Sequence, residues 1–115
     1  MKIRDNFKKG SVEMIILHFL SVEDMYGYRI SKLVLQETDN YLSLNEGSLY
    51  PAFAKLVDRG MISTYKKLVG KKLSRTYYHL EKEGAEHLKE LKKEFFAVNE
   101  AITKILNYRG EEKPE

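Results

Sequence analysis

The sequence predicts a mainly α (α+β) fold in which short helices are followed by a two-stranded hairpin and one long helix. Three patterns predict this fold. Apolar residues recur at helical spacing over residues 49–57, and Gly60 follows them as a helix-ending residue. Residues 62–80 are rich in aromatic and β-branched side chains. Residues 83–108 return to helical spacing. A short helix that leads directly into a basic hairpin is the layout of a winged helix-turn-helix.

Two amphipathic helices are expected near the start of the chain. The first spans residues 11–21, with Ser11 as its N-cap. The second spans residues 28–38 and ends at Asp39-Asn40. The extended residues 41–44 are expected to add a stub strand to the hairpin. The residues expected to face inward from these two helices are Val12, Ile15, Ile16, Phe19, Leu20, Ile30, Leu33 and Val34.

The third helix has two alternative starts. Asn45 is a good N-cap, but it places Pro51 inside the helix, where proline costs about 3 kcal/mol. If Ser48 is the cap, Pro51 falls in the first turn and costs little. Either start presents Ser48 and Tyr50 at the exposed end of the helix, with Lys55 further along. The inward face of this helix is expected to comprise Leu49, Phe53, Leu56 and Val57.

Positive charge is concentrated in the part predicted to form the winged helix. Residues 1–80 hold 13 Lys/Arg and 8 Asp/Glu, whereas residues 81–115 hold 7 and 9. In a winged helix-turn-helix, the helix before the hairpin enters the DNA major groove and the hairpin tip lies against phosphates. Tyr26 and Tyr28 fit either phosphate contact or simple packing of the second helix. The candidate DNA-binding residues are Tyr26, Tyr28, Ser48, Tyr50, Lys55, Lys71, Lys72 and Arg75.

The long C-terminal helix predicts a homodimer. Its apolar residues are spaced 3, 4, 3, 4 and 3, which is the a/d pattern of a coiled coil. Such a helix is roughly 39 Å long, which exceeds what a winged-helix domain of about 70 residues can cover. The excess apolar surface needs a partner, most simply a second copy in a two-fold arrangement. The candidate interface residues are Leu88, Leu91, Phe95, Val98, Ile102 and Ile105.

Several short motifs are arranged along the chain in a specific order. They are Tyr26-Gly27-Tyr28, Gly47-Ser48-Leu49-Tyr50-Pro51 and Gly60-Met61-Ile62, followed by Tyr77-Tyr78, Leu80 and Gly84. Together they resemble the PadR family of bacterial transcriptional regulators, over roughly residues 9–106. The run G-S-L-Y-P, at its distance from Y-G-Y, is the most specific part of the resemblance.

The resemblance implies a dimeric winged-helix repressor of the short form, with a single C-terminal dimerisation helix. Glu81 stands where the family usually has Thr, and its carboxylate still suits the start of the last helix. Phe95 stands where several drug-binding members carry Trp. In the family this seam can open into an apolar pocket, so Phe95, Phe96 and Asn99 are candidate ligand-binding residues. The alternative is that both phenylalanines are dimer core.

Composition and motifs argue against several other classes of protein. The length of 115 residues, with 43% apolar and 32% charged residues, predicts one soluble globular domain. No apolar stretch approaches the ~18 residues of a membrane span, and no signal peptide is recognisable, so a cytoplasmic location without membrane partners is expected. The chain lacks cysteine and its three histidines lie on separate elements, so neither a metal nor another cofactor is expected. No phosphate loop or nucleophile elbow occurs, which argues against an enzyme.

The predicted function is that of a sequence-specific DNA-binding regulator. Its simplest form is a homodimeric repressor of a pseudo-palindromic operator, released by a planar apolar small molecule. Two alternatives remain, namely a protein–protein adaptor that uses the long helix and a non-specific architectural DNA-binding protein. The expected organisation is a DNA-binding domain at residues 1–80, a dimerisation helix at residues 81–110 and a disordered tail at residues 111–115.

Overall fold

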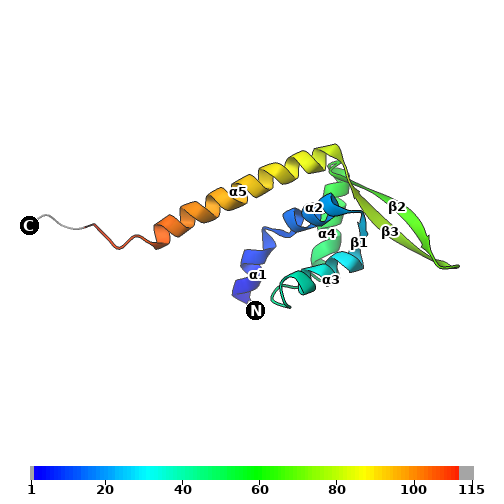
Figure 1. Cartoon of the computed structure of the whole chain (residues 1–115), viewed down its shortest axis with the longest axis horizontal. Helices are drawn as coiled ribbons and strands as arrows, with labels where there is room; N and C mark the ends of the chain where they lie inside the picture. Colours follow the sequence, from blue (N-terminus) through cyan, green and yellow to red (C-terminus); the bar gives the residue numbers. More distant parts are fainter. Residues whose placement is uncertain (1, 112–115) are drawn as a thin grey trace, which may run out of the picture.

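Five helices and a three-stranded antiparallel sheet make up residues 2–111, the part of the chain that the computed structural model describes (Figure 1). Strand β3 lies between β1 and β2. The hairpin projects from the helical body on one side, and α5 runs away from it on the other (Figure 1). The predicted winged helix with a long C-terminal helix is confirmed. The elements are α1 (Lys2–Lys9), α2 (Val12–Val22), β1 (Met25–Tyr26), α3 (Gly27–Glu37), α4 (Glu46–Asp58), β2 (Ile62–Val69), β3 (Leu73–Leu80) and α5 (Lys82–Leu106).

The hydrophobic core lies where α2, α3 and α4 meet the root of the sheet and the start of α5. Most residues predicted to face inward are buried or pack against this core. Val57 is an exception, because it is 37% exposed at the edge of the α4 apolar face. The buried core residues are Ile16, Leu17, Leu20, Met25, Ile30, Val34, Leu44, Leu49, Phe53, Leu56, Ile62, Tyr78 and Leu88.

Strands β2 and β3 form the predicted wing. Ile62 pairs with Leu80 at the root and Val69 pairs with Leu73 near the tip, which leaves residues 70–72 as the turn. Gly70 has a φ of 74°, a left-handed conformation that favours glycine over residues with a Cβ. The register of the wing therefore agrees with the strand pattern and the turn residues in the sequence.

The stub strand predicted at residues 41–44 is wrong. The third strand is β1, where Met25 pairs with Tyr78 of β3. Residues 41–44 have no regular secondary structure, and the hydroxyl of Thr38 accepts the Leu42 N–H at 3.0 Å. A side chain thus satisfies a backbone group that would otherwise favour a sheet partner.

Helix α1 was not predicted from the sequence. It packs against the segment between α3 and α4 through two basic side chains. A guanidinium nitrogen of Arg4 donates to the Tyr41 carbonyl at 3.3 Å, and Lys8 Nζ donates to the Ser43 carbonyl at 2.7 Å. The Arg4 guanidinium also lies 3.9 Å from the centre of the Tyr41 ring. These are long-range contacts, which local sequence patterns do not reveal.

The helix starts differ in how they are capped. Ser11 occupies the predicted N-cap position of α2. Its hydroxyl donates to the Lys8 carbonyl at 2.7 Å, however, and accepts no hydrogen bond from the first turn of the helix. Asn45 is the N-cap of α4, where its Oδ1 accepts the Ser48 N–H at 3.0 Å. Pro51 therefore lies inside the helix. Burial of Leu49 and its neighbours, at about 1.5–3 kcal/mol for each side chain, offsets the cost of this proline.

Helix α5 is fastened to the body at its first turns. A Cβ at Gly84 would overlap the Met61 carbonyl and lie 2.7 Å from Leu80 Cδ1, so this close approach requires glycine. Glu81 is the N-cap residue of α5, and its N–H donates to the same Met61 carbonyl at 3.0 Å. Leu88 is buried one turn further along.

The end of α5 marks the end of regular structure in the described residues. Glu111 lies in no helix or strand, and the rest of the predicted disordered tail, residues 112–115, lies outside the described residues. Among the helices of residues 2–111, none combines the length and the hydropathy needed to cross a bilayer.

Candidate nucleic-acid interface

Four of the predicted DNA-binding residues meet in one depression between the starts of α3 and α4. The Arg75 guanidinium lies 4.3 Å from the centre of the Tyr26 ring, a cation–π contact that restricts the arginine. Tyr28 and Tyr50 are 64% and 49% exposed, so their phenols are open to a ligand. A restrained cation beside phenolic donors suits a phosphate group. The depression has a volume of about 370 Å³ and is lined by Tyr26, Gly27, Tyr28, Tyr50, Arg75, Thr76 and Tyr78.

Gly27 explains the spacing of the Tyr26-Gly27-Tyr28 motif. A Cβ at this position would lie 3.3 Å from Cε2 of Phe53, which is tighter than an ordinary van der Waals contact. The glycine therefore lets the first turn of α3 approach α4 closely. As a result the two tyrosines that flank it reach the same depression as Tyr50.

Aromatic contacts join α4 to the wing behind this depression. Phe53 stacks on Tyr78 with ring centres 4.0 Å apart and an interplanar angle of 14°. Tyr50 meets the edge of Phe53 with ring centres 6.0 Å apart. Burial raises the pKa of Tyr78, so its phenol stays neutral over the physiological range. The exposed Tyr50 is thus supported by a buried aromatic pair.

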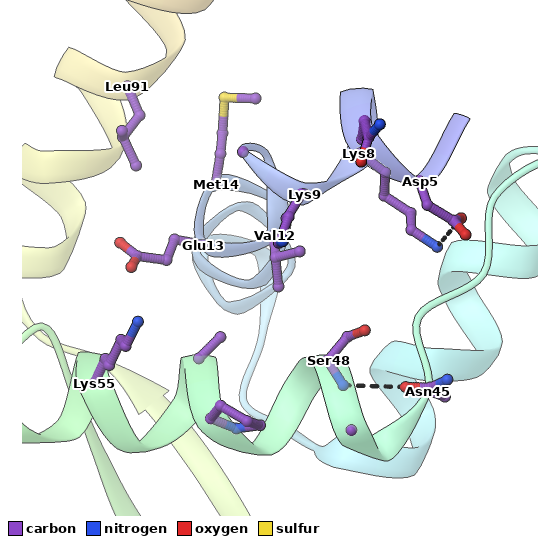
Figure 2. Close-up of a pocket in the computed structure, with 15 residues that line it drawn as sticks. Asp5, Lys8, Lys9, Val12, Glu13, Met14, Asn45, Ser48, Lys55 and Leu91 are labelled. Atoms are coloured by element: carbon purple, nitrogen blue, oxygen red, sulfur yellow. Dashed lines mark hydrogen bonds and ion pairs between the residues drawn. The ribbon is translucent and has the colours of Figure 1, made fainter. Parts of the chain in front are cut away.

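Ser48 and Lys55 lie on the other flank of α4. They are seven residues apart and both line a groove of about 730 Å³ between α4 and the α1–α2 region. Figure 2 shows both side chains on the side of α4 that faces α2. Glu13 of α2 lines the same groove. The structure therefore separates Ser48 and Lys55 from the depression that holds Tyr50.

The outward ridge of α4, between these two flanks, carries small side chains over most of its length and Asp58 at its end. Gly47, Pro51 and Ala54 are exposed and lie opposite the buried face of the helix. A ridge of small residues lets a helix backbone approach base edges closely, and an alanine methyl suits contact with a thymine methyl. Pro51 and Ala54 were not among the predicted DNA-binding residues. A helical wheel drawn from the buried Leu49 and Phe53 identifies them.

The tip of the wing is basic, as predicted. Lys71 and Lys72 lie in the turn and are exposed. Lys66 and Lys67 on β2 were missed, although counting back from the turn pairs Lys67 with Arg75. The Lys67 ammonium lies 5.4 Å from the centre of the Tyr77 ring, so this lysine is partly restrained as well.

The predicted dimer residues on α5 divide into two groups. Leu88 is buried in the core of its own domain and Leu91 packs against that core, so the burial of both is explained within one chain. Figure 1 shows the distal part of α5 extending past the body without a neighbouring element. The four remaining residues are exposed by 42% (Phe95), 50% (Val98), 48% (Ile102) and 70% (Ile105).

The two phenylalanines predicted to bind a ligand line an apolar depression of about 220 Å³ between α2 and α5. Their ring centres are 5.1 Å apart, at an interplanar angle of 75°. Ile15 and Phe19 contribute the α2 side of the depression. Asn99 does not line it, and its amide nitrogen donates to the Phe95 carbonyl at 2.6 Å within the helix.

Comparison with known proteins identifies the family. The profile of the transcriptional regulator PadR-like family matches residues 16–90, more than half of the chain. This chain belongs to the PadR-like family. An uncharacterized protein of Lysinibacillus sphaericus is 33% identical to this PadR-like chain over 100 residues, covering 87% of this chain and 92% of that protein.

Solved structures of PadR-like and related regulators share the fold. A transcriptional regulator from Clostridium thermocellum superposes with a TM-score of 0.80 at 36% identity, covering 86% of this chain and 96% of that chain. PadR of Bacillus subtilis in complex with operator DNA superposes with a TM-score of 0.64 at 24% identity, covering 90% of this chain and 50% of that chain.

Within residues 2–111, no group of three or more His, Cys, Asp or Glu side chains is arranged to hold a metal ion.

The position of Lys71 and Lys72 at the exposed wing tip generates a prediction. Replacing both by alanine is expected to weaken binding to all DNA sequences alike, because phosphates carry no sequence information. The slope of log K against log salt is expected to flatten by up to about two units per wing. Tyr50→Ala is expected instead to reduce the preference for a specific site.

Fluorescence anisotropy over a salt series measures both quantities. A matched control replaces Lys89 and Lys93, two exposed lysines on α5, by alanine and so removes the same charge elsewhere. An unchanged slope for the Lys71/Lys72 variant would mean that the wing does not touch the DNA backbone.

Proposed function

We propose that this PadR-like regulator is a homodimeric repressor that binds a pseudo-palindromic operator in the cytoplasm. The observation that carries the proposal is the depression in which Tyr28, Tyr50 and Arg75 meet at the exposed end of α4, next to a lysine-bearing wing. A helix end flanked by phosphate-binding groups suits entry into the major groove, with contacts to the backbone on either side. Residues 1–80 then act as the DNA-binding part and residues 81–110 as the dimerisation helix.

The individual contacts follow from this docking mode. Tyr26, Tyr28 and Arg75 bind phosphates beside the groove, and Lys71 and Lys72 bind the backbone further out. Tyr50 approaches the DNA major groove from one flank of α4, and Ser48 and Lys55 approach it from the other. PadR of Bacillus subtilis, which has the same fold, was solved in complex with operator DNA, and this supports a DNA-binding role for the present chain.

The homodimer is supported by the exposed apolar residues of distal α5. Val98, Ile102 and Ile105 recur at a/d spacing, and among residues 2–111 they stay 50%, 48% and 70% exposed. A second copy in a two-fold arrangement covers this stripe and repeats the DNA-binding surface. A two-fold protein in turn requires an operator with two related half-sites.

Selection of genomic DNA fragments by the purified protein tests the function. A repressor of this kind is expected to enrich a small set of sequences that contain an inverted repeat. It should prefer them over shuffled DNA by ~10³ or more at equal salt. Uniform recovery of all fragments would identify a non-specific architectural protein. Absence of DNA binding at any salt concentration would favour a protein–protein adaptor that uses α5.

Ile102 lies in the middle of the proposed dimer seam on distal α5. Ile102→Asp places an unpaired charge in the seam, where burial costs several kcal/mol, so light scattering should report a monomer or an aggregate. Thr103→Asp adds the same charge one position round the helix and is expected to leave the dimer intact. A wild-type protein that is monomeric at micromolar concentration contradicts the proposed interface.

A planar apolar effector is the remaining part of the proposal. Phe95 and Phe96 line an apolar depression against α2, and a two-fold seam brings Phe95 of one subunit near Phe95 of the other. Facing rings can hold a flat molecule, with stacking worth roughly 0.5–1.5 kcal/mol per ring beyond area burial. Asn99 lies one turn along but outside the depression, and its amide nitrogen is hydrogen-bonded to the Phe95 carbonyl, so the proposed site depends on the two phenylalanines. An effector that binds the free form better than the DNA-bound form would release the operator.

Calorimetry with planar aromatic compounds checks the effector. Micromolar binding to the wild type is expected, with a clear loss in Phe95→Ala. Val22→Ala is a matched truncation of an exposed apolar residue at the end of α2 and should bind as the wild type does. Equal binding by the Phe95 variant, or no binding by any compound, leaves Phe95 as plain dimer core.

A further inference from the structure

One carboxylate ties both strands of the wing to the helical body. Asp24 lies in the loop between α2 and β1, and its Oδ2 accepts a hydrogen bond from the Tyr65 hydroxyl of β2 at 2.8 Å. Its Oδ1 lies 2.8 Å from Nδ1 of His79 on β3. None of these three residues lines the depression around Arg75. We refer to Asp24, Tyr65 and His79 together as the wing latch.

The wing latch lies on the outer face of the sheet. Tyr65 pairs with Tyr77 and Ser63 pairs with His79 across the two strands. Because side chains alternate along a strand, these residues face away from the buried Tyr78. The latch is therefore accessible to solvent and to protons.

A continuous set of ring contacts leads from the wing latch to two cations. The Tyr65 ring stacks on Tyr77 with centres 5.6 Å apart, and Tyr77 meets the edge of Tyr26 at 5.5 Å. Lys67 lies over the Tyr77 ring and Arg75 lies over the Tyr26 ring. A change in how Tyr65 is held thus reaches the side chains that face the proposed DNA phosphates.

A second contact fastens the same face of the wing to α5. The Ser63 hydroxyl donates to a carboxylate oxygen of Glu81 at 2.6 Å, and Glu81 is the N-cap residue of α5. The root of the wing is therefore held from two sides, by the α2–β1 loop and by the first residue before α5.

Two carboxylates act on His79. The hydrogen bond that His79 makes to Asp24 raises the pKa of His79 above its usual 6.5, the charges of Asp24 and Glu81 add to this, and partial burial opposes it. Tyr65, on the neighbouring strand, shares Asp24 with it. Burial alone would raise the pKa of Asp24, but the hydrogen bonds from His79 and Tyr65 hold that pKa below its usual value. The two groups therefore form an ion pair below the His79 pKa, and above it a hydrogen bond between a neutral imidazole and the Asp24 carboxylate.

The geometry points to Asp24 as a positioning residue for DNA binding, whose proton-dependent bond to His79 holds the wing in the orientation that presents Lys67 and Arg75 to phosphate. This inference rests on the proposed operator binding. A held wing loses less conformational freedom when DNA binds, which favours the complex. A hydrogen bond between two opposite charges holds more firmly than one between a neutral imidazole and a carboxylate, because the Coulomb attraction is added. Since the His79 pKa is raised, the ion pair is present at low pH and is lost as pH rises through that pKa.

Operator affinity measured at constant ionic strength between about pH 5.5 and 8.5 tests the wing latch. Wild-type affinity is expected to fall about three- to tenfold as pH rises, a modest change because the pair is partly exposed. His79→Gln should bind with a flat pH profile. Tyr65→Phe should bind more weakly at every pH but keep the pH dependence, because the His79–Asp24 pair remains.

Asp24→Asn separates the wing latch from simple electrostatics. Removing a negative charge near the DNA should tighten binding if charge alone matters, and His79 would still titrate. The latch predicts the opposite, namely weaker binding with a flat profile. Glu37→Gln removes one exposed carboxylate at the far end of α3 and measures the pure charge effect. Asp24→Asn that binds as tightly as Glu37→Gln, or that keeps the wild-type pH profile, overturns the inference.

A histidine titration by NMR keeps the test independent of the operator. The His79 pKa should lie above 6.5 in the wild type and move toward that value in Asp24→Asn. If no operator is found, the proposed function fails, while this titration still decides whether the wing latch exists. A His79 pKa that is the same in both proteins overturns the latch.

Discussion

The stack of Phe53 on Tyr78 determines where every proposed DNA contact lies. Its ring centres are 4.0 Å apart, and the two residues are only 2% and 8% exposed. Phe53 belongs to α4 and Tyr78 to β3, and Tyr78 also pairs with Met25 of β1. The helix that presents Tyr50 and the wing that carries the lysines are thereby joined as one unit. Gly27 is confined by the same Phe53 ring, so α3 is placed by it too.

Around this buried stack, weaker surface contacts join the wing to the helical body. Asp24, Tyr65 and His79 are partly exposed, so each contributes little to stability, and the role proposed for them is to restrain the hairpin. Helix α5 shows a similar division along its length. Its first turns pack against the body at Gly84 and Leu88, whereas Ile102 and Ile105 are 48% and 70% exposed. One helix thus completes the core of its own chain and leaves an apolar stripe exposed along its distal part.

Local patterns predicted the wing and the main helices because these elements follow from spacing and turn chemistry. Gly70 with two lysines after it defines the turn, and the α4 stripe identifies the buried face. Patterns failed where long-range contacts decide the outcome. Helix α1 depends on Arg4 and Lys8 binding distant carbonyls, and β1 is too short to show any alternation. The apolar spacing of α5 also did not reveal that Leu88 packs within its own chain. The separation of Ser48 and Tyr50 on different flanks of α4 needs no long-range contact, because residues two apart on a helix are about 200° apart, and a helical wheel would have predicted it.

In the proposed complex, α4 and the wing of two identical chains bind DNA together. Hydroxyl-radical footprinting on an operator selected by the purified protein tests this arrangement most directly. We expect two equivalent protected segments with centres about 10 base pairs, or a multiple of that, apart and related by a two-fold axis. Each segment should show outer protection that disappears in the variant with Lys71 and Lys72 replaced by alanine. A single protected segment, or uniform protection of the whole fragment, would rule out a two-fold complex of this kind.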